Sequence, residues 1–232
     1  NTQSPEVGSR VTVFAGQGGL AEYGYFPAER LIKIPDSMPS EVAAGFQVAY
    51  GTSHIALTHC ARLKKNDTLL VLGAAGGVGL TAVELGKYFG AQVIAAARGQ
   101  EKLNIAKRFG ADVLIDTNKE NLRDVVKSLG GADVVYDPIG GDLFKEAVRA
   151  CKPEGKILTI GFASGDIPVI AANYLLVKNL SVIGLNWGAY LKFNPKVISS
   201  SVRELTKLYT DKILTPHISH IFPLSETNAA LE

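Results

Sequence analysis

Residues 70–80 read LVLGAAGGVGL, and this stretch decides the fold. A short apolar run leads into four glycines, Gly73, Gly76, Gly77 and Gly79, after which an apolar pattern of helical spacing begins. Glycine allows positive φ in a tight turn and lets main-chain amides approach an anion. The N-terminus of a following helix favours negative charge through its dipole. The stretch therefore predicts a phosphate-binding turn between a strand and a helix.

The residues around the last glycine distinguish two kinds of phosphate-binding loop. A nucleoside-triphosphate loop requires a Lys-Ser/Thr pair there, whereas this sequence continues with Leu80 and Thr81. The dinucleotide pattern G-x-G-x-x-G is met by Ala74, Gly76 and Gly79, with alanine in place of the first glycine. A dinucleotide is therefore the predicted ligand, and a glycine turn that serves packing alone is the alternative.

Strand-like and helix-like segments alternate from Asp67 onward. The predicted strands cover residues 68–72, 92–97, 113–115, 133–136, 156–160 and 180–185. The predicted helices cover residues 77–89, 100–109, 122–129, 142–151, 170–177 and 195–209. Strands that are apolar on both faces and are separated by helices indicate a parallel sheet covered on both sides. The predicted fold class is α/β, with a doubly wound six-stranded Rossmann sheet.

The end of the second strand predicts which dinucleotide binds. An NAD site places a carboxylate there to hold the ribose 2′-hydroxyl. Here the strand ends in three alanines, and Arg98 and Lys102 follow without an acid at the strand end. A guanidinium fork and an ammonium both suit a phosphate dianion, so NADPH is the predicted cofactor. Two solvated residues at a helix start remain the alternative.

Turn-forming residues follow three further strands. They read DPIGG at 137–141, GFASG at 161–165 and NWG at 186–188. Ligands bind beyond the carboxyl ends of such strands, where glycine lets a flat nicotinamide ring pack on the backbone. Ordinary loops are the alternative for each one. Trp187 is predicted either to border the substrate cleft or to anchor packing.

Composition excludes several classes of function. The 232 residues carry 24 basic and 22 acidic side chains, so no general attraction to nucleic acid or to a membrane is expected. Two cysteines predict a reducing compartment, the cytoplasm, with a mitochondrial location left open. The pairs His59-Cys60 and His217-x-x-His220 are interpreted as non-ligands, and no zinc is predicted. Cys151, at a predicted helix end, is interpreted as a small buried hydrophobe.

The N-terminal part has a different pattern of predicted secondary structure. Residues 10–14 and 20–35 are strand-like, and a helix is predicted from residue 39 to about residue 61. The chain begins with polar residues and no methionine, so we expect it to represent part of a longer protein.

Six stretches together resemble a known family. They are VGSRVTVF (7–14), VAYGTSHIAL (48–57), VLGAAGGVG (71–79), AARGQEK (96–102), YDPIGGD (136–142) and GLNWGAY (184–190). These resemble the zinc-free quinone reductase, or zeta-crystallin-like, branch of the medium-chain dehydrogenase/reductase superfamily. The resemblance implies a partial GroES-like catalytic domain over 1–47, an NADP-binding Rossmann domain over 48–211 and a return segment to the catalytic domain over 212–232. The active cleft would lie between the two domains.

The resemblance also implies the places of individual residues. Thr52 would lie by the nicotinamide, and Thr117 near the adenosine. Lys102, with Arg98 beside it, would hold the 2′-phosphate. The remaining cofactor-binding residues would be Gly73, Ala75, Gly76, Gly77 and Val78 over the pyrophosphate, and Pro138, Gly140, Gly161, Phe162, Ala163, Asn186 and Trp187 toward the nicotinamide half. No catalytic residue is predicted, because the family's substrate tyrosine lies in a stretch absent before Asn1. Zinc-using relatives carry a cysteine ligand in the segment matching 43–47, and this sequence has none there.

The predicted function is that of a zinc-independent, NADPH-dependent reductase. Hydride would pass to a small electrophilic acceptor, either a quinone or an α,β-unsaturated carbonyl. An enoyl-thioester reductase is one alternative, for which Lys192 and Lys196 offer a faint basic rim. A non-catalytic NADPH-binding protein is the other. By resemblance alone, the chain is expected to form a homodimer through residues 180–185.

Overall fold

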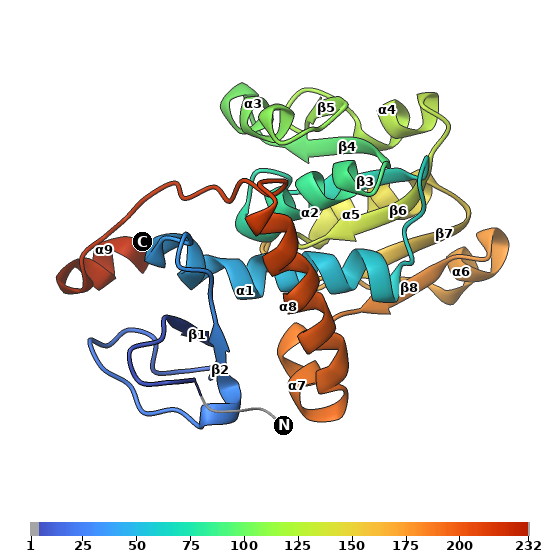
Figure 1. Ribbon diagram of the computed structural model, residues 1–232. Helices are drawn as coiled ribbons and strands as arrows, with labels where there is room; N and C mark the ends of the chain where they lie inside the picture. Colours follow the sequence, from blue (N-terminus) through green and yellow to red (C-terminus); the bar gives the residue numbers. More distant parts are fainter. Residues whose placement is uncertain (1–4, 232) are drawn as a thin grey trace. The chain divides into compact units, whose positions relative to one another are not determined.

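The computed structural model describes residues 5–231, which divide into two compact units (Figure 1). One unit combines the described residues up to Gly51 with those from Tyr190 onward, and the other runs from Thr52 to Ala189. The sequence placed its domain boundaries at 47/48 and 211/212. The extents of a GroES-like and an NADP-binding domain stay predictions.

The unit from Thr52 to Ala189 is built on a six-stranded parallel sheet. Its strands are β3 (Thr68–Leu72), β4 (Gln92–Ala97), β5 (Val113–Asp116), β6 (Ala132–Asp137), β7 (Cys151–Thr159) and β8 (Ser181–Gly184). They lie in the order β5-β4-β3-β6-β7-β8. Two of the predicted strands, 68–72 and 92–97, agree to the residue. The predicted doubly wound sheet is confirmed.

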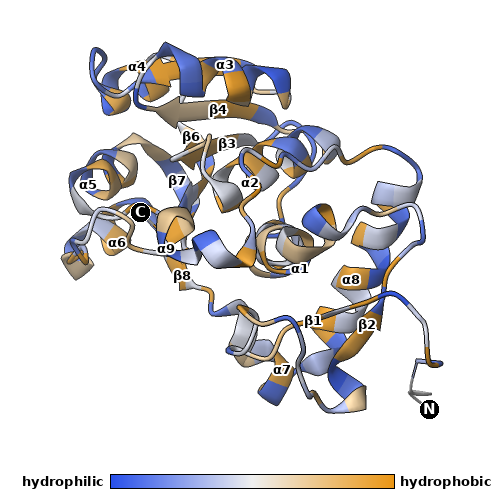
Figure 2. Ribbon diagram, turned by 90° about the vertical axis from the view of Figure 1, so that its left-hand side faces the viewer, coloured by the Kyte–Doolittle hydropathy of each residue, from blue (hydrophilic) through white to orange (hydrophobic). Residues whose placement is uncertain are grey.

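Helices cover both faces of this sheet (Figure 1). They are α2 (Gly77–Tyr88), α3 (Gln100–Arg108), α4 (Leu122–Ser128), α5 (Gly141–Ala150) and α6 (Ala172–Lys178). Leu70, Leu72 and Val135 form a core with Phe144 of α5 on one face. On the other face, Gly86 of α2 lies against Leu69 and Val93. All five residues of β3 are buried, as expected for a strand covered on both sides. In Figure 2 the central strands have colours toward the hydrophobic end of the scale.

One strand begins earlier than the sequence indicated. Cys151, placed by the sequence at a helix end, opens β7, because its backbone is extended and it pairs with Ala132 of β6. The register then shifts between Ala132 and Val134. The interpretation of Cys151 as a buried hydrophobe agrees with its burial, which raises the pKa of the thiol to about 12.

The other unit contains a two-stranded antiparallel ribbon of β1 (Val11–Val13) and β2 (Leu31–Lys33). The expectation of strand structure across residues 20–35 was wrong except for β2, and residues Ala28–Arg30 form the short helix η1. Gly24 and Pro27 interrupt that segment, and proline cannot donate to a strand ladder. Besides η1, the helices assigned wholly to this unit are α7 (Tyr190–Phe193), α8 (Pro195–Thr210), η4 (Leu224–Glu226) and α9 (Thr227–Leu231).

The helix predicted over 39–61 forms in two parts. Helix α1 (Ser40–Ile55) passes through Gly45 and Gly51, and a wider π-helical turn, η2 (Ala56–Cys60), follows it. Phe46 of α1 packs within its unit against Tyr50 and Tyr209, with ring centroids 4.7 and 5.7 Å apart. Across residues 5–231, no helix combines the length and the apolar character that crossing a bilayer requires.

Candidate functional site

The strand order fixes where a ligand can meet this sheet. From β3 the chain moves outward through β4 to β5 and then returns to β6 on the other side of β3. Strand order therefore reverses between β3 and β6, and their carboxyl ends lead into the glycine turn and the DPIGG turn. Doubly wound sheets bind ligands beyond the carboxyl ends of the strands at such a switch point.

The glycine turn has the form of an anion cradle. Gly73 has a φ of +60°, and its carbonyl accepts the Gly76 amide at 2.9 Å. A Cβ on Gly79 would overlap with the Gly73 carbonyl, whereas a Cβ on Gly77 would meet open space. The first turn of α2 then presents main-chain amides that have no partner within the helix. The predicted residues from Gly73 to Val78 thus lie in one turn and in the start of α2, a strand–turn–helix junction of the kind that binds anions.

Three buried hydroxyl groups hold the first turn of α2. Ser53 Oγ, in the last turn of α1, lies 2.8 Å from both Thr81 Oγ1 and the Tyr136 hydroxyl. Ser53 and Thr81 donate to the Val78 carbonyl at 2.9 and 3.0 Å. Burial raises the pKa of Tyr136 well above its ordinary range, so the phenol stays protonated. The sequence analysis missed this cluster, whose only signal was one hydroxyl residue in each of three apolar segments: Ser53, Thr81 and Tyr136.

The end of β4 lies beside the end of β5. The Thr117 amide donates to the Ala97 carbonyl at 3.0 Å, which places Thr117 next to the turn that carries Arg98. Arg98 and Lys102 are both exposed, and Gly99 between them has a φ of +85°. The structure therefore brings Arg98 and Thr117 to one edge of the sheet, with Lys102 in the first turn of α3.

A carboxylate that the sequence analysis overlooked holds this edge. Asp116 ends β5 and is buried, and its Oδ1 accepts the amides of Gly99 at 3.0 Å and Asn118 at 3.1 Å. These two bonds lower the pKa of Asp116, and Lys119, whose Nζ lies 3.6 Å from Oδ2, lowers it further. The sequence does place an acid at a strand end. It ends β5, the third strand of the sheet along the chain, whereas the analysis looked for an acid at the end of the second strand, β4.

The turns after β6 and β7 are bonded to each other. The Asp137 carbonyl accepts the Ile160 amide at 2.8 Å, and the Pro138 carbonyl accepts the Ala163 amide at 3.0 Å. A Cβ on Gly140 would lie 2.7 Å from the Asp166 carbonyl oxygen, so this position requires glycine. The structure thus brings Pro138 and Gly140 together with Gly161, Phe162 and Ala163.

Asp137 is buried at the base of these turns. Its Oδ1 accepts the amides of Ile139 at 2.7 Å and Gly140 at 2.9 Å, while its Oδ2 has no hydrogen-bond partner among residues 5–231. Burial raises the pKa of this carboxyl, and the two amides oppose that effect only in part. Asp137 therefore shapes the turn that follows β6.

The remaining predicted residues lie at two other places in the same unit. The Leu185 amide donates to the Thr159 carbonyl at 3.1 Å, so Asn186 and Trp187 follow along the edge that carries the β6 and β7 turns. Trp187 is buried, which agrees with the packing alternative. Thr52 is buried on α1 next to Ser53.

Two further features bear on alternative sites. Within residues 5–231, no group of three or more His, Cys, Asp or Glu side chains is arranged to hold a metal ion.

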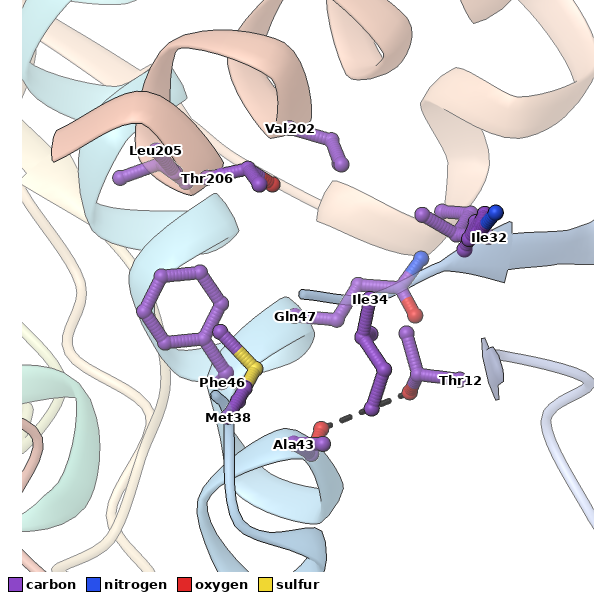
Figure 3. Close-up of a pocket in the computed structure, with 11 residues that line it drawn as sticks. Thr12, Ile32, Ile34, Met38, Ala43, Phe46, Gln47, Val202, Leu205 and Thr206 are labelled. Atoms are coloured by element: carbon purple, nitrogen blue, oxygen red, sulfur yellow. Dashed lines mark hydrogen bonds between the residues drawn. The ribbon is translucent and has the colours of Figure 1, made fainter. Parts of the chain in front are cut away.

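Figure 3 shows a pocket in the other unit, with Thr12, Ile34, Phe46 and Gln47 among its lining residues. Its space, partly open to solvent, is about 350 Å³. None of the predicted cofactor residues lines this pocket.

Known proteins are similar to this chain in sequence and in fold. Residues 77–207 match the family model described as zinc-binding dehydrogenase. A quinone oxidoreductase from Pseudomonas aeruginosa is 30% identical over 97% of this chain and 70% of its own length. The chain belongs to the quinone oxidoreductase branch of the medium-chain dehydrogenase/reductase superfamily. The resemblance read from the sequence is therefore confirmed.

Other members of this superfamily extend the comparison. A quinone oxidoreductase-like protein 2 homolog from Nematostella vectensis is 43% identical over 97% of this chain, and the chain spans 63% of that protein's length. The quinone oxidoreductase of Thermus thermophilus, solved also as its complex with NADPH, superimposes with a TM-score of 0.87. It is 29% identical over 97% of this chain and 73% of its own. The likeness thus covers both units, while the curated relative is longer than the chain.

Proposed function

We propose that this chain carries the cofactor site of an NADPH-dependent reductase. The observation that supports it most is the pairing of two features on one sheet edge. A glycine turn with the shape of a pyrophosphate cradle lies at the switch point, and exposed Arg98 and Lys102 follow the neighbouring strand. The NADPH complex of the Thermus thermophilus relative agrees with this assignment.

Each part of the dinucleotide would meet different groups of this chain. Amides of the first turn of α2 would bind the pyrophosphate, and Arg98 and Lys102 would bind the 2′-phosphate with Thr117 beside the adenosine. The backbone of the Pro138–Gly140 and Gly161–Ala163 turns would border the nicotinamide half, with Thr52, Asn186 and Trp187 toward the same half. Bound NADPH supplies the hydride, and the protein supplies orientation and exclusion of water.

The proposed acceptor is a quinone or an α,β-unsaturated carbonyl, reduced without zinc. The predicted site residues are glycines, small or apolar residues, an amide, threonines and cations, and none of them is a carboxylic acid, a histidine or a cysteine. A reaction supported by such residues suits an electron-poor acceptor that takes hydride directly and obtains its proton from solvent. The same residue types also suit a protein that binds NADPH without turnover.

Binding measurements test the cofactor assignment first. Trp187 is the chain's one tryptophan and provides an intrinsic fluorescence signal, and calorimetry provides an independent one. We expect NADPH to bind about tenfold or more tightly than NADH, a difference of about 1.4 kcal/mol. Equal affinities would contradict the role of Arg98 and Lys102. Failure of both dinucleotides to bind would contradict the cofactor site itself.

An acceptor screen then separates the catalytic proposals. Absorbance at the NADPH band is followed with a quinone, an enone and an enoyl thioester, with and without a chelator. Oxidation by the quinone or enone that survives the chelator supports the zinc-independent reductase. Turnover of the thioester alone favours the enoyl-thioester alternative, and tight NADPH binding without turnover favours a non-catalytic role.

We also propose that the chain pairs with a second copy through β8. Strand β8 ends the sheet order, so one of its edges has no strand neighbour among the described residues. Leu176 and Val177, on the preceding helix, are each 79% exposed, and Val169 is 86% exposed. Such an apolar surface beside a free strand edge favours association. Light scattering of the wild-type chain and of Leu176→Asp tests this, and a monomeric wild type would contradict it. A cytoplasmic location stays a prediction.

A further inference from the structure

Asp116 occupies a place where a carboxylate is unexpected in an NADPH site. It ends β5, and β5 lies beside β4, whose end carries Arg98. A free carboxylate near this edge would repel a 2′-phosphate and would offer an acceptor to the ribose hydroxyls of NADH. The contacts of Asp116 therefore bear directly on which dinucleotide the chain prefers.

Both oxygens of this carboxylate are engaged. Oδ1 accepts the Gly99 amide at 3.0 Å and the Asn118 amide at 3.1 Å. Oδ2 faces Lys119, whose Nζ lies 3.6 Å away. Asp116 is 5% exposed, so water contributes little to its solvation. The first bond fixes the backbone of the residue that follows Arg98, and the ion pair places a third cation at this edge.

We propose that Asp116 and Lys119 set the preference for NADPH, with Asp116 as a positioning residue for the Arg98–Gly99 turn and Lys119 as a third ligand of the 2′-phosphate. This inference rests on the proposed function, since it refines the same cofactor site. Lys119 adds a positive charge at an edge where both Asp116 and Glu120, whose Oε2 accepts the Asp116 amide at 2.9 Å, are negative, and a phosphate that carries nearly two negative charges requires such compensation.

The geometry lets Lys119 change partner. The Lys119 side chain is 74% exposed, and its contact with Asp116 is longer than a hydrogen bond. Exposed ion pairs of this kind contribute little stability, whereas ammonium–phosphate contacts are charge-assisted and stronger. Lys119 can therefore turn toward a bound phosphate while Asp116 keeps its two amide bonds.

Lys119→Ala in the full chain tests the first part. The ligands are NADPH, NADH and 2′,5′-ADP, with affinity measured by calorimetry at two salt concentrations. We expect affinity for NADPH and 2′,5′-ADP to fall about five- to tenfold, with a shallower salt dependence, and affinity for NADH to stay unchanged. The matched control is Lys107→Ala, an exposed lysine in the last turn of α3, which should change neither. Equal NADPH affinity in Lys119→Ala and wild type would overturn this part.

Two variants of Asp116 test the positioning role. Asp116→Asn keeps an oxygen for both amides and removes a negative charge, so we expect NADPH affinity to be retained or raised. Asp116→Ala removes the acceptor, and we expect NADPH affinity to fall several-fold more than NADH affinity. Equal losses for both dinucleotides, or a loss in Asp116→Asn as large as in Asp116→Ala, would overturn the positioning role. If wild type binds neither dinucleotide, the proposed function fails and this inference fails with it. If wild type prefers NADPH and the variants do not alter that preference, only this inference fails.

Discussion

The hydroxyl of Tyr136, on β6, lies 2.8 Å from Ser53 Oγ, at the end of α1. Ser53 in turn contacts Thr81 Oγ1, and both serine and threonine reach the Val78 carbonyl. Each hydroxyl carries one proton, so Tyr136 donates to Ser53, and the serine proton goes either directly to the Val78 carbonyl or to Thr81, which donates to that carbonyl. The central sheet thereby holds the helix turn that we assign to the pyrophosphate.

Tyr136→Phe should weaken both the fold and the binding of either dinucleotide. The change removes one buried hydrogen bond and leaves Ser53 without that donor, a loss of about 1–2 kcal/mol in the free energy of unfolding. Because NADPH and NADH share the pyrophosphate, their affinities should fall by the same factor. Urea unfolding and calorimetry measure the two effects. Tyr174→Phe, on a partly exposed tyrosine of α6, is the control. A loss confined to NADPH would contradict this account.

Gly79→Ala should disrupt the glycine turn. The added Cβ would overlap with the Gly73 carbonyl, and forcing an extra methyl into such a contact costs about 1–3 kcal/mol of stability. Gly77→Ala is the matched control, since its Cβ meets open space and alanine is about 1 kcal/mol more favourable than glycine in a helix. Thermal or urea unfolding compares the two. Similar stability losses in both variants would contradict the close approach of Gly79 and Gly73.

The sheet was predictable because its strands are continuous apolar runs bounded by turn residues. β3 and β4 are buried almost throughout, and a strand covered on both faces cannot be confused with an amphipathic helix of this length. The expectation of strand structure over residues 20–35 failed because a strand-like pattern there is not accompanied by burial or pairing. Their alternating aromatic residues follow a strand pattern, but most of the segment is exposed and finds no strand partner among the described residues.

The contacts within the candidate site could not be predicted in the same way. Asp116 matters because β5 pairs with β4 so that Ala97 lies opposite it, and a sequence does not disclose that register. Tyr136 and Ser53 are 83 residues apart in the sequence and meet only through the packing of α1 on the sheet. The glycine turn was recognisable because its residues are contiguous, whereas the groups that hold it in place are scattered along the chain. The cofactor roles of Arg98 and Lys102 stay predictions.

Asp137→Asn should change how stability depends on pH. Burial raises the pKa of Asp137 above its ordinary 3.8. The folded chain therefore holds this proton to a higher pH than the unfolded chain, so the free energy of unfolding falls as pH rises from about 3.8 through the folded pKa. Asparagine cannot ionise, and the stability of the variant relative to wild type should increase over that window. Urea unfolding at several pH values measures this difference.

Asp142→Asn is the control, because the pKa of Asp142 is shifted in the opposite direction to that of Asp137. Asp142 accepts a hydrogen bond from Lys145, which lowers the pKa of Asp142, so its ionisation adds stability as pH rises toward and past 3.8. Asp142→Asn should therefore lose stability relative to wild type as pH rises from the folded pKa of Asp142 to about 3.8, whereas Asp137→Asn gains stability as pH rises above 3.8. Parallel pH dependences in the two variants would show that burial does not raise the pKa of Asp137.

Arg98→Ala and Lys102→Ala should each reduce affinity for NADPH and leave affinity for NADH unchanged. Both side chains are exposed and follow the end of β4, where a 2′-phosphate would lie and where the strand ends in alanines and not in a carboxylate. Each loss should be about tenfold, or about 1.4 kcal/mol, and should diminish at high salt because the contacts are exposed charges. The larger loss is expected for Arg98, since a guanidinium can bind two phosphate oxygens at once. Calorimetry with both dinucleotides gives the comparison. If NADPH binds equally well to the double variant and to wild type, these cations do not read the phosphate, and the preference for NADPH must be sought at another part of the site.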